Sequence, residues 1–232
     1  MKLRLSELHV FGFLVDSLFH SCRLTRLNGS ALKGPMVDEK VPLCVWFTAP
    51  PDLFSEVIDA GAKELNTSPF LAHVTAIGRV PHVSNSELLR TVEAVAALSA
   101  PFELETGDAV AGEQFFQCVY AGVSPGGGGD AAEAVHLELV KRLYVDKKEE
   151  YKGPNESYMP HLSLVYGDLA MEMKRAWAEK LNSVSSSDEC PLRVKGRRWK
   201  VKTLDVVTAD LSDVSSWKLV ASFPLLGSQG GG

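Results

Sequence analysis

The sequence is short of cysteine, of long apolar runs and of positive charge, and each shortage excludes a class of protein. The four cysteines form no C-x-x-C pair and lack zinc spacing, so we expect small buried residues in a reducing compartment. No apolar run approaches the length of a membrane span. The net charge of −5 provides no overall positive field to attract nucleic acid. These shortages together predict a soluble, cytoplasmic protein.

Two missing motifs narrow the chemistry. There is no H-E-x-x-H sequence and no convincing cluster of carboxylates, so we expect no metal and no cofactor. There is also no Gly-rich phosphate loop of the kind that opens a dinucleotide-binding domain. An anionic ligand would therefore need a site built from individual side chains.

The two ends of the chain stand apart from the rest. Residues 1–40 begin with apolar positions at helical spacing, but Asp16 cuts the apolar stretch short and argues against a secretory signal. An organellar presequence, an appended helix and a misassigned start all fit this segment. The Gly-rich residues 227–232 predict a disordered tail. The domain itself should therefore span 41–226.

Within that domain, strand-like and helix-like segments alternate. We expect strands over 41–49, 71–80, 102–106, 114–123, 158–166, 190–196, 199–209 and 216–226, and helices over 52–65, 85–99, 131–145 and 169–183. Asp168 should cap the last helix, 124–130 reads as a flexible linker, and 147–157 reads as a charged loop. A hairpin across 107–112 favours antiparallel pairing, and hence an α+β fold.

Two strand-like segments carry the same unusual pattern. His73 and Thr75 lie two residues apart in the first, and His161 and Ser163 lie two residues apart in the second. Because residues i and i+2 of a strand share a face, each strand presents an imidazole and a hydroxyl together. Two such strands side by side would present two imidazoles and two hydroxyls at one place.

That combination suits the opening of a phosphodiester. One imidazole can take the proton from the attacking oxygen while the other protonates the leaving oxygen, each contributing roughly 10²–10⁴-fold. The hydroxyls can donate hydrogen bonds to the non-bridging oxygens, where charge must be stabilised. Neither step requires a metal, and the sequence does not say which histidine is the acid.

Spacing alone is weak evidence, because His82 and Ser84 show it too. Pro81 precedes that third pair, and a helix-capping sequence follows it, so it lies at a loop-to-helix boundary. A single histidine in a strand is more often a hydrogen-bonded structural residue than a catalyst. The two mid-strand pairs, one in each half of the domain, are what favour a catalytic site.

The stretches FLAHVTAIG and YMPHLSLVYGDL resemble the paired motifs of the 2H phosphoesterase superfamily, with a closer match to its plant-type cyclic phosphodiesterase branch. VWFTAPP (45–51), FFQCVY (115–120) and the residues Tyr158, Met159, Pro160 and Tyr166 support that branch. The resemblance covers about residues 41–226. It implies two pseudosymmetric lobes, each an antiparallel sheet with outer helices, around a central cleft.

The resemblance also implies an activity and a set of site residues. It implies metal-independent hydrolysis of small cyclic phosphates, which include ADP-ribose 1″,2″-cyclic phosphate from tRNA splicing and nucleoside 2′,3′-cyclic phosphates. We also expect a monomer. Carried over by position, the acid and base are His73 and His161, the phosphate ligands are Thr75, Ser163 and Tyr166, and the rings beside the base are Trp46 and Phe116. Tyr166 lies an odd step from Ser163, so it needs a bulge or a strand end to reach the phosphate.

Other interpretations stay open at this point. The same site could process RNA ends as a 2′–5′ ligase-like or exonuclease-like enzyme, although the acidic composition disfavours long RNA. It could also bind a nucleotide without catalysis. The basic stretch 193–202 predicts a solvated outer face, with Arg198, Lys200 and Lys202 opposite Trp199 and Val201; a patch for RNA or pyrophosphate is the alternative.

Overall fold

The computed structural model describes residues 41–144, 158–184, 190–210 and 213–227. The predictions for residues 1–40, the charged loop at 147–157 and the tail at 228–232 lie outside these ranges. Within them, the chain forms one antiparallel sheet with helices packed on it, as expected for an α+β fold. The strands are β1 (Leu43–Thr48), β2 (His73–Ile77), β3 (Phe102–Ala111), β4 (Val119–Val123), β5 (His161–Val165), β6 (Arg198–Val201), β7 (Thr203–Thr208) and β8 (Leu219–Pro224).

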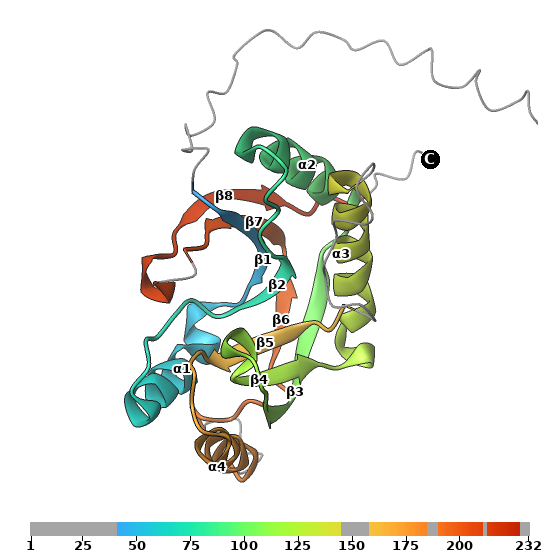
Figure 1. Ribbon diagram of the computed structural model, residues 1–232. Helices are drawn as coiled ribbons and strands as arrows, with labels where there is room; N and C mark the ends of the chain where they lie inside the picture. The colour runs from blue at the N-terminus through green and yellow to red at the C-terminus, as the bar shows by residue number, and fades with distance from the viewer. Residues whose placement is uncertain (1–40, 145–157, 185–189, 211–212, 228–232) are drawn as a thin grey trace, which may run out of the picture. The chain divides into compact units, whose positions relative to one another are not determined.

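In the part of the chain that the structure describes, eight strands follow the order β6-β3-β4-β5-β2-β1-β7-β8. The sheet therefore consists of two four-stranded halves, and each half places its histidine-bearing strand innermost. The two antiparallel halves match the two expected lobes. Pairing of β2 with β5 joins them into one curled sheet (Figure 1).

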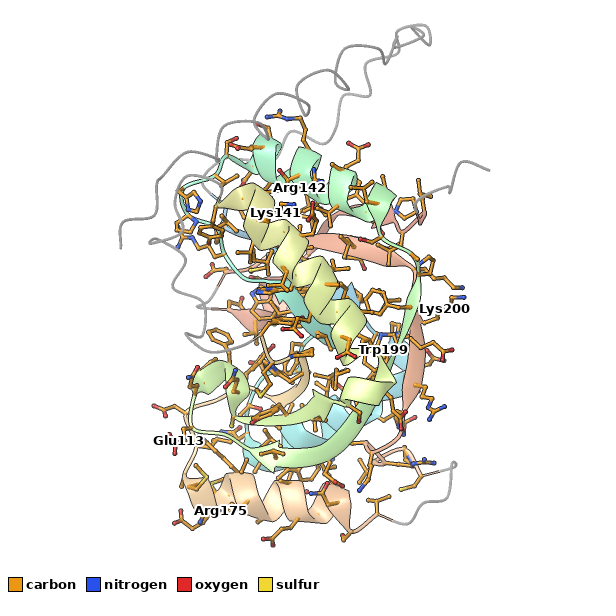
Figure 2. The ribbon with its side chains drawn as sticks, turned by 90° about the vertical axis from the view of Figure 1, so that its right-hand side faces the viewer. Glu113, Lys141, Arg142, Arg175, Trp199 and Lys200 are labelled. Carbon is orange, nitrogen blue, oxygen red and sulfur yellow. The ribbon has the colours of Figure 1, made fainter. Side chains whose placement is uncertain are left out.

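The four α-helices of the described residues divide between the two halves of the sheet. Helices α1 (Pro51–Leu65) and α4 (Met171–Asn182) pack on the half that contains β5 and β3, and α2 (Asn85–Leu98) and α3 (Gly129–Leu143) pack on the half that contains β7, β8 and β2. Figure 1 shows these two pairs at opposite ends of the sheet, and Figure 2 shows α3 lying across the strands behind it.

Each helix buries one apolar stripe. In α1 the buried residues are Phe54, Val57, Ile58, Gly61, Ala62 and Leu65, which follow helical spacing. Gly61 lets α1 lie close to both α4 and β5, because a Cβ at this position would lie 3.0 Å from Val165 and 3.1 Å from the indole of Trp177. The outer layer over β5 therefore depends on a small residue at this contact.

The strand pairing between the two halves of the sheet is short. In the described residues the register between β2 and β5 consists of one pair, Val74 with Leu162. Both side chains are fully buried and point away from the face that carries the histidines. Two donors beyond this pair hold β2 in place: the Tyr158 hydroxyl donates to the Thr75 carbonyl at 2.7 Å, and the His136 ring bonds the Ala76 carbonyl at 2.7 Å.

Several predicted boundaries were wrong. Residues 190–196 form turns and not a strand, and 199–209 forms two strands, β6 and β7, separated at Lys202. The segment 114–118 contains a short 3-10 helix, so β4 begins only at Val119. Ala170 and not Asp168 occupies the N-cap of α4. These segments were predicted to be strands because they contain apolar residues. In the structure such residues also pack in the core from turns and irregular backbone.

The Gly-rich run at 124–130 was predicted to be a flexible linker, and the structure corrects this. Residues Pro125–Gly127 form a 3-10 turn that leads directly into α3. Gly128 has φ of 91°, and a Cβ there would lie only 1.7 Å from the carbonyl oxygen of Glu103. Gly128 is therefore required for a close passage over β3, which composition alone does not distinguish from flexibility.

Candidate active site

The two histidine motifs lie on one face at the centre of the sheet. Since Val74 pairs with Leu162 in antiparallel register, His73 lies opposite Ser163 and Thr75 lies opposite His161. Ordinary sheet geometry separates the Cα atoms of diagonal neighbours by roughly 7–8 Å. His161 is close enough to His73 to disfavour a positive charge on it. The sequence-predicted quartet is therefore brought together by one strand pairing.

His73 lies beneath aromatic rings. Its side chain is only 3% exposed, but its neighbours belong to the smaller apolar cluster of Trp46, Tyr166 and Trp217 and not to the main core. The imidazole stacks on the indole of Trp46 with 3.6 Å between centroids and an interplanar angle of 8°. The edge of Trp217 approaches the same imidazole at 5.9 Å. One ring face of His73 is thus closed by protein.

The hydrogen bonds of His73 determine its tautomer. Nδ1 lies 2.6 Å from the carbonyl oxygen of Leu71, so Nδ1 carries the proton and donates. Nε2 is then the basic nitrogen, and it accepts from the Tyr166 hydroxyl at 3.3 Å. Burial lowers the pKa of His73 to about 4, with a smaller contribution from His161. At neutral pH the ring is therefore uncharged, with its lone pair on Nε2.

His161 is arranged in the same way but is more accessible. Its Nδ1 lies 2.9 Å from the carbonyl oxygen of Met159, so Nε2 again carries the lone pair. Burial lowers its pKa, and the Met159 carbonyl opposes that change. Tyr120 meets the imidazole edge to face at 5.1 Å. Each histidine is therefore oriented by the carbonyl two residues before it.

The hydroxyl groups and the phenol complete the site. Ser163 is buried and donates to the Phe116 carbonyl at 3.1 Å, whereas Thr75 is half-buried. Tyr166 reaches His73 because β5 ends at Val165, which removes the problem of its odd spacing from Ser163. Burial raises the pKa of Tyr166, so its phenol remains a hydrogen-bond donor.

Trp46 and Phe116, the two rings expected beside a nucleobase, differ in how accessible they are. Trp46 is 2% exposed, and His73 already occupies one face of its indole, so that face is closed to a ligand. Phe116 lies on the 3-10 helix at 115–117, half-buried, with its ring edge to face against Tyr166 at 5.2 Å. Of these two rings, only Phe116 retains some exposure.

The structure adds residues that sequence reasoning did not select. Tyr120 and Gly122 lie two residues apart on β4. Tyr120 pairs with Ser163, and Gly122 pairs with His161. A Cβ added to Gly122 would meet no atom within 4 Å, so space is open directly beside His161. Phe70 stacks on Tyr166 at 4.0 Å, and Trp217 closes the cluster beside Trp46. The alternation along FFQCVYAG could have indicated Tyr120 and Gly122, but Trp217 gave no signal.

The basic stretch lies apart from the histidines. Strand β6 exposes Arg198 and Lys200 and buries Trp199 and Val201, as predicted. Figure 2 shows Lys200 and Trp199 on this edge strand of the sheet. Arg198 pairs with Glu105 at 2.8 Å. The solvated face is therefore confirmed for β6.

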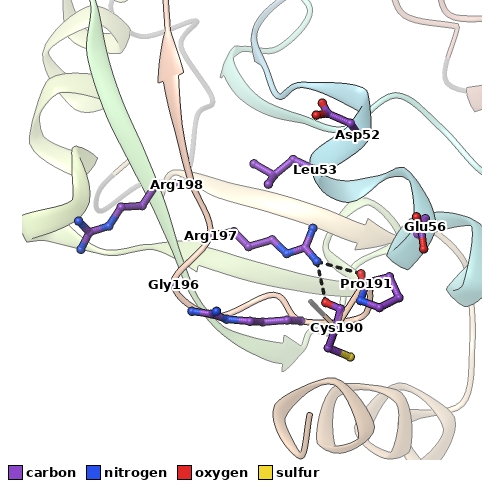
Figure 3. A pocket seen from close by; sticks show the side chains of 9 residues that line it. Asp52, Leu53, Glu56, Cys190, Pro191, Gly196, Arg197 and Arg198 are labelled. Carbon is purple, nitrogen blue, oxygen red and sulfur yellow. Dashed lines mark hydrogen bonds between the residues drawn. The ribbon is translucent and has the colours of Figure 1, made fainter. Parts of the chain in front are cut away.

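Three arginines from this region line a separate cavity of about 420 Å³ beside α1 (Figure 3). Its lining residues are Asp52, Leu53, Glu56, Cys190, Pro191, Arg193, Gly196, Arg197 and Arg198. Arg197 donates to the carbonyls of Cys190 and Pro191, both at 3.0 Å. Neither histidine motif contributes to this lining, so the cavity is not part of the candidate active site.

The described residues also bear on metals and membranes. They contain no group of three or more His, Cys, Asp or Glu side chains placed to hold a metal ion. Over the same part of the chain, no helix is both long and apolar enough to cross a bilayer.

The arrangement defines a class of protein. Two oriented, neutral imidazoles, two hydroxyls and a phenol on one face of a curled antiparallel sheet form an acid–base site of the kind that acts on phosphate esters. Comparison with known proteins agrees with this class. The chain belongs to the cyclic phosphodiesterase-like protein family, whose model matches residues 51–225.

Solved structures share the fold. TT0787 of Thermus thermophilus superposes with a TM-score of 0.55 at 16% identity, over 81% of this chain and 99% of that one. Escherichia coli LigT in complex with 3′-AMP gives 0.51 at 13% identity, over 80% and 98%. LigT in complex with NADP⁺ gives 0.51 at 12% identity, over 80% and 98%. No curated protein sequence matches the chain. Membership of the 2H phosphoesterase superfamily is thereby confirmed, whereas the plant-type branch stays a prediction.

Proposed function

We propose that the protein hydrolyses small cyclic phosphates, with ADP-ribose 1″,2″-cyclic phosphate and nucleoside 2′,3′-cyclic phosphates as the substrate class. The observation that carries this proposal is the single strand pairing that brings His73, Thr75, His161 and Ser163 to one face. The family match supports a cyclic phosphodiesterase, and the LigT complexes with 3′-AMP and NADP⁺ show that this fold accommodates nucleotides in that protein.

In the proposed reaction, water attacks the phosphorus atom of the cyclic phosphate. One imidazole accepts the proton of the water on Nε2 while a new P–O bond forms. For His73, the Tyr166 hydroxyl that donates to Nε2 in the structure would first turn to the phosphate. The P–O bond to the ribose breaks, and the second imidazole, protonated in the complex, gives its proton to the departing oxygen. Both histidines hold Nδ1–H against a carbonyl, so both direct Nε2 at the reaction.

The acid must acquire a proton that the resting site disfavours. Burial lowers the pKa of both imidazoles, but a bound phosphate would place a negative charge beside them and favour an imidazolium. His161 is the more exposed of the two and exchanges protons with solvent more easily. We therefore assign the acid to His161 and the base to His73, which is neutral and accepts a hydrogen bond at Nε2.

The hydroxyls would hold the phosphate. Thr75 and Ser163 flank the two imidazoles on the same face, and the Tyr166 phenol lies next to His73. In the structure Ser163 donates to the Phe116 carbonyl and Tyr166 donates to His73, so these two hydroxyls would turn to the phosphate when it binds. Donors placed there stabilise the charge that develops on the non-bridging oxygens. Phe116, which is half-buried beside Tyr166, is the ring we propose to border a nucleobase.

Direct turnover measurements test the proposal. ADP-ribose 1″,2″-cyclic phosphate, the four nucleoside 2′,3′-cyclic phosphates and a short RNA ending in a 2′,3′-cyclic phosphate should be compared at equal concentration. We expect turnover of the small substrates, with one phosphomonoester formed for each ring opened. Exclusive action on the RNA would favour an RNA-end enzyme, and tight binding without any product over hours would favour a nucleotide-binding domain.

A further inference from the structure

The surroundings of Trp46 follow from where its strand places it. β1 lies between β2 and β7, so Trp46 pairs with Thr75 on one side and with Asp205 on the other. Its backbone is therefore fixed by ladders on both sides. The indole is buried, and its neighbour Trp217 contacts it edge to face at 5.3 Å. An indole held in this way is a rigid surface.

His73 lies flat on that surface. The rings are nearly parallel, at 8°, with 3.6 Å between centroids. The two nitrogens of His73 are held in the plane of the ring, Nδ1 by Leu71 and Nε2 by Tyr166. The in-plane bonds set the rotation of the imidazole, and the indole sets its tilt. Among the described residues His161 has no comparable support, because Tyr120 meets it only edge to face.

We infer that Trp46 is a positioning residue for His73: the stacked indole fixes the tilt of the imidazole, so that its in-plane hydrogen bonds keep one tautomer and Nε2 stays on the side of the reacting phosphate. This inference rests on the proposed function and replaces the expectation that Trp46 stacks on a nucleobase. A base could use the face now covered by His73 only by displacing the histidine that the reaction needs.

The resting protein provides the first test, which needs no substrate. The carbon-bound ring protons of a histidine stacked on an indole are shifted upfield by the ring current, and the ring ¹⁵N shifts report the tautomer. We expect an upfield-shifted His73 with a single Nδ1–H tautomer, assigned by its loss in His73→Gln. An unshifted ring, or an equal mixture of tautomers, would overturn the inference even if no Trp46 variant folded.

Substitution provides the second test. Trp46→Leu removes the aromatic surface, and Trp46→Phe keeps a smaller one. We expect Trp46→Leu to populate the Nε2–H tautomer and to raise the pKa of His73 by about one unit or more, since water gains access to the ring. Trp46→Phe should stay close to the parent protein. Trp177→Leu is the matched control, because Trp177 is equally buried but packs in the outer layer against Gly61.

Kinetics separate positioning from base stacking. For Trp46→Leu we expect kcat to fall by roughly tenfold or more, by the same factor on all four nucleoside 2′,3′-cyclic phosphates, with KM little changed. A rise in KM that is larger for purines than for pyrimidines, with kcat retained, would overturn the inference.

The two proposals can also fail separately. If the parent protein turns over no cyclic phosphate but the ring shift, the tautomer and the Trp46→Leu changes appear as expected, the proposed function fails and the positioning of His73 stands. If turnover is observed and Trp46→Leu leaves kcat and the His73 signals unchanged, the proposed function stands and the positioning role of Trp46 fails.

Discussion

Val74 and Leu162 are the one pair through which β2 and β5 are joined in the described part of the chain, and this pairing places the histidines and hydroxyls of the candidate site. A shift of one residue would turn His161 and Ser163 to the opposite face, into the core that Leu162 now occupies. The complete burial of both apolar side chains therefore fixes the register on which the proposed chemistry depends.

Removal of either imidazole should strongly lower turnover without unfolding the protein. We expect His73→Ala and His161→Ala each to lower kcat by about 10²–10⁴-fold, because each removes one proton transfer. Steady-state kinetics on a nucleoside 2′,3′-cyclic phosphate measure the effect, and circular dichroism monitors the fold. His82→Ala is the control, since His82 has the same spacing to a serine but bonds the Leu143 carbonyl away from the site. Near-normal rates in either active-site variant would contradict the mechanism.

The buried state of His73 should make the protein less stable in mild acid. Its pKa is about 4 in the folded protein against an ordinary 6.5, so the unfolded chain binds the proton more readily. The stability contributed by the neutral ring is complete above about pH 6.5 and is lost as the pH falls toward 4, by on the order of 3 kcal/mol. Urea unfolding at several pH values, in parallel with His73→Gln, measures it. The free energy of unfolding should change less steeply with pH in the variant than in the parent protein. Equal pH dependence in the two proteins would mean that burial does not shift the titration of His73.

The hydroxyls should affect the chemical step more than binding. We expect Thr75→Val and Ser163→Ala each to lower kcat by about 10²–10³-fold, as for the loss of a donor to a developing negative charge. Thr75→Ser, which keeps the hydroxyl, is the matched control and should retain most of the rate. An increase in KM alone would show that these groups bind the ground state only.

Gly122 should separate stability from activity. Its Cβ position is open, so Gly122→Ala should raise the free energy of unfolding by about 0.4–1 kcal/mol through a less flexible unfolded chain. The same methyl group points beside His161, and Gly122→Val should raise KM several-fold by filling the space proposed for substrate. Gly126→Ala, another open position, is the control for stability alone. Unchanged kinetics in Gly122→Val would place the substrate elsewhere.

Turnover should not depend on a metal. The proposed proton transfers and hydrogen bonds come entirely from side chains, so activity in excess EDTA should equal activity without it. The assay should follow one cyclic phosphate before and after exhaustive dialysis against chelator. A loss that zinc or magnesium restores would require a different mechanism.

The sequence predicted the parts of the site that depend on strand alternation. The faces of His73, Thr75, His161 and Ser163 follow from a period of two, and the structure places them on one face as that period requires. The adjacency of β2 and β5 does not follow from any local pattern. It entered through the family resemblance, because strand order is set by long-range packing.

The parts that were missed depend on tertiary contacts. The stacking of His73 on Trp46 needs β1 beside β2, and the approach of Trp217 needs the loop between β7 and β8. The ordered Gly-rich turn before α3 needs β3 beneath it. Composition could not show any of these contacts, since the residues lie far apart along the chain.

The strand pairing at Val74 and Leu162 has a consequence for the geometry of the candidate site. Residues next to a paired residue are held by the same ladder as the pair itself. The two imidazoles belong to residues directly next to the pair, His73 before Val74 and His161 before Leu162. Their mutual spacing is therefore set locally, at the centre of the sheet, and does not depend on contacts at its distant edges.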